Sequence, residues 1–126
     1  MGYRSEVVLA ISKHLTPFLT LATSQNAEAQ ALVFKHADHF DRDYGGDKSW
    51  LIRWDHIKWY ESHDDIQALE KFISEACSDE YEFEVDGKAQ SSCDHIRFVR
   101  VGEESGDIEM MGDGFWDIYP TTHICY

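Results

Sequence analysis

Residues 78–87, which read SDEYEFEVDG, alternate acidic and apolar side chains. In an extended strand the carboxylates share one face and the apolar side chains share the other. Alternate strand residues lie about 6.6 Å apart, a spacing similar to that of successive phosphates along an extended nucleic-acid strand. The row therefore imitates a short phosphate track in charge and in geometry. Its members are Glu80, Glu82, Glu84 and Asp86.

Two interpretations of this acidic row stay open. In the first, it docks on a Lys/Arg-rich protein surface. In the second, it is a solvated face that guards an edge strand against aggregation. Further acids extend the row in the first interpretation: Glu75, Asp79, Glu103, Glu104, Asp107 and Glu109.

The charge of the chain favours a basic partner. The formal net charge is −13, although 43% of the residues are hydrophobic and a folded core is expected. Residues 1–63 hold 8 acidic and 7 basic residues, whereas residues 64–126 hold 16 acidic and 4 basic ones. Such a field attracts basic protein surfaces and repels nucleic acids and anionic membranes. We expect a basic protein partner, no direct nucleic-acid contact and no membrane contact.

Adjacent aromatic residues offer an apolar anchor for such a partner. Trp59 and Tyr60 are neighbours in the sequence, so in a strand they face opposite ways and one of them is partly exposed. An exposed aromatic side chain beside an acidic surface is a good anchor for a protein partner. The remaining tryptophans are expected mainly in the core: Trp50, Trp54 and Trp116.

The metal and thiol candidates are weaker. His36 and His39 have the spacing of one helical face and stand near Asp41 and Asp43, yet nothing in the sequence fixes a third ligand, so we expect no metal.

Cys93 and His95 share a strand face, but the surrounding acids raise a thiol pKa and oppose nucleophilic activation. Cys77 suits a small core position. Because no catalytic motif is present, we expect a non-enzymatic protein without a cofactor.

The pattern of elements predicts a single α+β domain over residues 1–126. Strands are expected at residues 3–11, 49–55, 78–87, 95–101, 108–111 and 115–119. Helices are expected from Pro17, over 27–37 with Asn26 as cap, and over 65–77 with Ser62 or Asp64 as cap. Together these elements predict an antiparallel or mixed sheet of about five to six strands, packed by two or three helices.

The cysteines and the apolar runs bear on the compartment. Three cysteines without a CxxC motif indicate reduced thiols, and no apolar run reaches the length of a bilayer span. We therefore expect a cytoplasmic protein.

Four segments resemble those of a group of small phage and prophage proteins, many of which begin with Gly-Tyr-Arg-Ser-(Glu/Asp)-Val. They are MGYRSEV at residues 1–7, WDHIKWYES at 54–62, FVRVGEE at 98–104 and DIE at 107–109. The segment DGKAQSSCDH is longer than its counterpart in that group. The resemblance implies a phage or prophage origin and the cytoplasm of a host cell. Small phage proteins commonly bind and inhibit host machines, including CRISPR complexes, and some are acidic mimics of DNA.

Two other classes of function stay open. One is a small-ligand or nucleotide-binding domain, with a pocket of aromatic and histidine side chains on which Arg4, Arg53, Arg97 or Arg100 converge. The other is a virion-associated structural protein with a symmetric interface. A homodimer is compatible with each of these functions.

Overall fold

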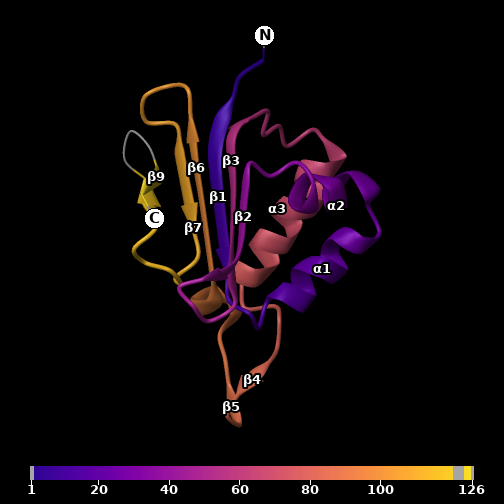
Figure 1. The fold of residues 1–126 in the computed structure, drawn as a ribbon, viewed down its shortest axis with the longest axis vertical. Helices are drawn as coiled ribbons and strands as arrows, with labels where there is room; N and C mark the ends of the chain where they lie inside the picture. The colour runs from indigo at the N-terminus through magenta and orange to yellow at the C-terminus, as the bar shows by residue number, and fades with distance from the viewer. Residues whose placement is uncertain (1, 121–123, 126) are drawn as a thin grey trace.

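Strand β1 (Ser5–Ile11) lies at the centre of a five-stranded antiparallel sheet with the order β2-β3-β1-β6-β7 (Figure 1). The computed structural model describes residues 2–120, 124 and 125. The other strands of the sheet are β2 (His39–Tyr44), β3 (Ser49–Ile57), β6 (Ile96–Gly102) and β7 (Ile108–Met111). The predicted α+β class and the predicted sheet packed by helices are confirmed.

Both faces of the sheet are covered, by different parts of the chain. Val7, Leu9 and Ile11 face the helices, whereas Val8 and Ala10 face a second cluster that includes residues near the C-terminal end. In Figure 1 the helices lie on one side of the sheet and β9 lies on the other. The small sheet on that side consists of β8 (Tyr119–Pro120) and β9 (Ile124–Cys125). The result is a layered domain with β1 buried from both sides.

The helix layer follows the sequence signals closely. Helix α1 (Thr16–Ser24) has Pro17 in its first turn, and the side chain of Asn26 caps α2 (Ala27–Phe34) by accepting from the Ala29 N–H at 3.0 Å. Helix α3 (Asp64–Cys77), predicted over residues 65–77, buries an apolar stripe: Ile66, Leu69, Phe72, Ile73 and Ala76. No helix within the described residues combines the length and the apolar character that crossing a bilayer requires.

Some boundaries differ from the predictions. Helix α2 ends at Phe34 instead of residue 37, and the unpredicted strand β2 follows it. The N-cap of α3 is His63, which makes no side-chain capping hydrogen bond, so the predicted Ser62 or Asp64 cap is wrong. Residues 115–118 form no strand because Phe115 adopts a positive φ of 51° and its carbonyl accepts from the Ile118 N–H, which closes a turn.

The two-sided burial of β1 yields a stability prediction. Replacing the fully buried Leu9 with alanine should lower the free energy of unfolding by about 2–5 kcal/mol, because the change leaves a cavity in the core. Leu21→Ala in α1 is the matched control, since Leu21 is 68% exposed. Urea unfolding of both variants measures the difference. Equal losses would contradict the assigned core.

Candidate protein-docking site

The acidic row leads into a short hairpin that projects from one end of the sheet (Figure 1): Glu84 and Asp86 lie in the hairpin, and Glu80 and Glu82 lie in the segment before it. Strand β4 (Glu84–Val85) pairs with β5 (Lys88–Ala89), and the turn between them consists of Asp86 and Gly87. These two residues have φ values of 53° and 77°, the left-handed conformations that a tight two-residue hairpin turn requires. The prediction of a continuous strand over residues 78–87 is therefore wrong for most of its length.

The separation of acids from apolar side chains is nevertheless present in the folded chain. Tyr81, Phe83 and Val85 are half-buried, while the intervening acids are exposed. The exposed acids are Glu80, Glu82, Glu84 and Asp86. We call them the hairpin acids.

Aromatic stacking fixes the apolar side of the hairpin to the body of the protein. The ring of Tyr81 stacks on Phe18 of α1 at 4.7 Å and on Phe72 of α3 at 5.5 Å, measured between centroids. Phe83 stacks on His14 at 5.6 Å and meets the edge of His95 at 4.8 Å. Burial, together with the charge of Glu75, raises the pKa of Tyr81 to about 12.

Polar contacts close the base of the hairpin. The Asp79 carboxylate accepts hydrogen bonds from the Ser91 hydroxyl and from the Cys93 N–H, the latter at 3.0 Å. These bonds, with that from Ser91 the stronger, lower the pKa of Asp79. The Gln90 N–H donates to the Phe83 carbonyl at 3.0 Å. Asp79 therefore acts as a structural acid and does not extend the row of free carboxylates.

A chain of side-chain hydrogen bonds continues from the hairpin into the sheet. Nε2 of His95 lies 3.2 Å from Oε1 of Gln90, and Nδ1 of His95 lies 2.8 Å from the Ser12 hydroxyl oxygen. Because the amide oxygen of Gln90 only accepts, Nε2 carries the proton and Nδ1 accepts from Ser12. Burial lowers the pKa of His95, and the nearby His14 lowers it further. The imidazole is thus held neutral between the hairpin and the end of β1.

The hairpin acids have no basic partner within the described part of the chain. The ion pairs there join Arg53 to Asp55, and Arg100 to Asp107 and Glu109. Lys88, on the return strand of the hairpin, forms no ion pair within 4 Å among the same residues. Four carboxylates therefore stand exposed on an anchored projection without an internal counter-ion.

The other acids that could have extended the row lie elsewhere or are occupied. Strand β6 runs away from the hairpin, so Glu103 and Glu104 lie at the opposite end of the sheet (Figure 1). The carboxylates of Asp107 and Glu109 are bound by Arg100. The predicted extension through these four acids is wrong, because the fold separates or neutralises them.

Arg100 forms a closed network at that opposite end. Its guanidinium donates to Glu109 at 2.8 Å, to Asp107 at 2.7 Å and to the Ser5 hydroxyl at 3.1 Å. The Tyr3 hydroxyl donates to Asp107 at 2.7 Å. The hydrogen bonds from Arg100, and then that from Tyr3, lower the pKa of Asp107 to about 2. Residues from three sequence segments (1–7, 98–104 and 107–109) thus meet in one network.

The predicted aromatic anchors are placed far from the hairpin. Trp59 is 7% exposed and donates from its indole nitrogen to Glu70 at 2.7 Å, so its prediction as an exposed anchor is wrong. Tyr60 is half-buried and contacts the His63 ring, in the connection that follows β3. The antiparallel order of the sheet places this connection at the end opposite the hairpin.

Trp116 is 81% exposed, so its prediction as a core residue is wrong. The preceding residues attach it to the hairpin end of the sheet, since the Asp113 N–H donates to the Cys93 carbonyl and the Gly114 N–H to the Ile96 carbonyl. The polar, glycine-rich segment GDGFWD was a signal for an exposed position, because it lacks the alternation of a buried strand.

The fold separates the two histidines of the candidate metal site. His36 lies beyond the end of α2 and His39 lies on β2, so the two do not share a helical face. Within the described residues, no group of three or more His, Cys, Asp or Glu side chains is arranged to hold a metal ion.

The two cysteines with described side chains are poorly activated. Cys93 lies in the 3₁₀ turn η1 (Ser92–His95), and its pKa is raised by burial and by Asp113. Burial raises the pKa of Cys77 to about 11. Both thiols are therefore protonated at neutral pH.

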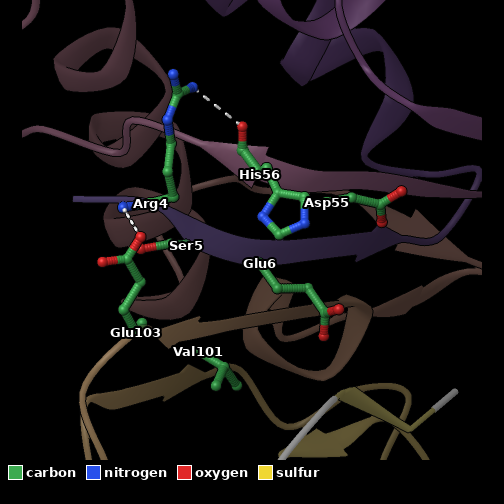
Figure 2. A pocket seen from close by; sticks show the side chains of 8 residues that line it. Arg4, Ser5, Glu6, Asp55, His56, Val101 and Glu103 are labelled. Carbon is green, nitrogen blue, oxygen red and sulfur yellow. Dashed lines mark hydrogen bonds between the residues drawn. The ribbon is translucent and has the colours of Figure 1, made fainter. Parts of the chain in front are cut away.

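The four arginines of the alternative ligand pocket do not converge. Arg97 is buried, and its Nε donates to the Gly114 carbonyl. Arg53 forms an ion pair with Asp55. Arg100 lies on the helix side of the sheet, where acidic side chains surround its guanidinium. A cavity of about 450 Å³ lies at the end of β1, β3 and β6. Figure 2 shows Arg4 extended away from Glu6 towards the His56 carbonyl, so its guanidinium does not lie among the acids of this cavity.

Comparisons of the chain with family models, curated proteins and solved structures find no match.

The Arg100 network predicts a pH dependence. Because the pKa of Asp107 falls from 3.8 to about 2 on folding, its contribution to stability is present above pH 4 and is lost as the pH falls through about 2. Asp107→Asn should be less stable than the wild type at neutral pH and should lose less stability between pH 4 and 2. Urea unfolding across that range, with Asp117→Asn as an exposed control, measures this. Parallel curves for wild type and Asp107→Asn would contradict it.

The His95 bridge predicts a titration. Its pKa lies below the usual 6.5, so the imidazole should be neutral at pH 7 with the proton on Nε2. Stability from this group is present above pH 6.5 and declines as the pH falls towards the folded-state pKa. Gln90→Glu should raise the pKa of His95, because a carboxylate stabilises the imidazolium. NMR titration measures the pKa, with Gln67→Glu as the matched control. An unchanged pKa in Gln90→Glu would refute the assigned contact.

Proposed function

We propose that the protein is a non-enzymatic binding protein that docks its acidic hairpin on a basic protein surface. The observation that carries this proposal is the absence of any described internal counter-ion for the hairpin acids, which are all exposed. Like charges that are aligned without compensation repel one another, and a cationic surface relieves that repulsion.

The anchoring of the hairpin supports a docking role. Stacking of Tyr81 and Phe83, and the bonds of Asp79, hold the acids in one arrangement before a partner arrives. Preorganisation of this kind lowers the conformational entropy lost on binding. The projection from the end of the sheet gives the carboxylates access to a groove as well as to a flat surface.

An apolar anchor is available at the same end of the molecule. Trp116 is 81% exposed, and its neighbours are hydrogen-bonded to the segment that closes the hairpin base. Tryptophan is enriched among the residues that dominate binding energy in interfaces. We therefore assign to Trp116 the role of apolar anchor, which the sequence predicted for Trp59 or Tyr60.

The partner class follows from the charge arrangement. A row of carboxylates on a projecting hairpin competes with nucleic-acid phosphates for Lys/Arg-rich grooves, so the proposed partner is a nucleic-acid-binding protein of a bacterial host. With the resemblance to small phage proteins, this makes the chain a proposed phage or prophage inhibitor of a host defence system, such as a CRISPR complex. Charge complementarity would speed association and make it sensitive to salt.

Charge reversal tests this proposal. The double variant Glu82→Lys/Glu84→Lys, immobilised and exposed to bacterial lysate, should lose proteins that the wild type retains at low salt. Glu61→Lys/Glu104→Lys is the matched control, because it changes the net charge equally in exposed connections at the opposite end of the sheet. Trp116→Ala should weaken retention at high salt as well as at low salt, since its contribution is apolar.

The identity of the retained proteins decides the outcome. Proteins that are retained by the wild type and by the control, and that duplex DNA releases in competition, would support docking on nucleic-acid-binding surfaces. Retention of the same proteins by all variants would show that the hairpin acids are not the docking site.

A further inference from the structure

Strand β7 forms an outer edge of the five-stranded sheet. This strand pairs with β6 only, among the described residues. The Gly102 N–H donates to the Asp107 carbonyl at 2.8 Å, so these two residues form a hydrogen-bonded pair. Hydrogen-bonded and non-hydrogen-bonded pairs alternate along an antiparallel ladder. The next hydrogen-bonded pairs are therefore Arg100–Glu109 and Phe98–Met111. The backbone groups of Met110 therefore point outward, and within residues 2–120 no other segment pairs with them.

A groove runs beside this edge on the helix side of the sheet. It has a volume of about 220 Å³ and lies between β7 and α3. Ile73 and Phe98, both buried, and the half-buried Met111 supply its apolar surface, and Glu70 and Glu109 supply its carboxylates. An added strand would direct the side chains opposite Glu109 and Met111 into this groove, because cross-strand neighbours share a face.

The charge in the groove selects a cation. The Glu70 carboxylate is half-buried and has one described hydrogen bond, from Trp59 at 2.7 Å. Burial raises the pKa of Glu70, and the charges of Glu61 and Glu109 raise it further. The hydrogen bond from Trp59 and the charge of Arg100 lower it, but only in part. A Lys or Arg side chain could lay its aliphatic stem on Phe98 and Met111 and place its charged head against Glu70.

The other face of the strand selects an apolar neighbour. Ile108 and Met110 are 43% and 52% exposed and point to the side away from the helices, in register with Val101 and Val99. An extended segment that alternates basic and apolar residues would match both faces of the β7 edge at once.

We infer that β7 binds an extended, Lys/Arg-bearing segment of the basic partner by strand addition, with a cationic side chain in the groove between β7 and α3. This inference rests on the proposed function, because it assigns a second contact to the same basic partner. A second copy of this chain is a poorer occupant, since both copies carry a net charge of −13, and self-pairing with Ile108 opposite Met110 would also bring their Glu109 side chains together.

A synthetic peptide of alternating lysine and valine tests the groove apart from the hairpin. Wild-type protein and the Glu82→Lys/Glu84→Lys variant should both bind it, and binding should slow hydrogen exchange of the Met110 amide. Glu70→Gln keeps the acceptor for Trp59 and should weaken binding about fivefold, the size of a partly exposed ion pair. A glutamate–valine peptide should not bind.

The edge itself is tested by a substitution at Met110. Met110→Pro removes the outward N–H and leaves the ladder to β6 intact, so it should abolish peptide binding, whereas Met110→Ala should retain most of it. Circular dichroism and urea unfolding verify that both variants are folded. Should the proline variant be unfolded, Glu70→Gln and the exchange of the Met110 amide in the wild type decide alone.

The outcomes separate this inference from the proposed function. Equal peptide binding by the wild type, Glu70→Gln and a folded Met110→Pro, or no slowing of Met110 exchange, would overturn the groove and leave the hairpin untouched. If Glu82→Lys/Glu84→Lys loses the lysate proteins but still binds the peptide, the result would support peptide binding in the groove independently of the hairpin. Concentration-dependent dimerisation that Met110→Pro abolishes would assign the edge to a second copy and overturn the inference.

Discussion

The burial of β1 on both faces is the constraint on which the rest of the structure depends. Residues 7–11 are fully shielded from solvent, and each Val, Leu or Ile side chain among them contributes roughly 1.5–3 kcal/mol when it leaves water. A strand of this kind needs a cover on either side. The helices supply one cover, and Ile118 and Ile124 belong to the other. Because the neighbouring strands are antiparallel, this central strand also determines which connections share each end of the sheet.

The two ends of the sheet differ in whether their carboxylates have a basic partner among the described residues. At one end Arg100 compensates Asp107 and Glu109 within a closed network that includes Tyr3 and Ser5. At the hairpin end, four exposed carboxylates have no counterpart among the described residues. Compensated acids stabilise the fold, whereas uncompensated acids cost repulsion that a partner can offset. This division locates the proposed docking surface, which the net charge alone does not locate.

Much of the fold follows from local patterns in the sequence. The apolar run at residues 7–11, the apolar stripe of α3 and the Asn26 cap are strong local signals, and the structure contains the strand, the helix and the cap that they indicate. Strand β2 lacks a signal in the sequence because HFDRDY is polar and has no buried residue, and it forms a strand through its pairing with β3. The acidic stretch predicts a long strand but forms a short hairpin, because alternation shows which side chains share a side and not which strand they pair with.

The candidate site was predictable only in part. The spacing of the hairpin acids identifies them in the sequence. The burial of Trp59 and the exposure of Trp116 depend on contacts between distant segments. Trp59 is covered by Trp54, Phe98 and Glu70, and Trp116 is displaced outward by the turn at Phe115. The Arg100 network was equally invisible in the sequence, since its members are separated by about a hundred residues.

The most direct test of the docking account is the rate of association with a protein that the wild type retains, measured across a range of salt concentrations. The comparison uses a variant with Glu80, Glu82 and Glu84 changed to glutamine and Asp86 to asparagine. Electrostatic steering predicts that the neutralised hairpin associates roughly tenfold more slowly at low salt and that the two rates converge at high salt. Equal association rates at every salt concentration would contradict the account.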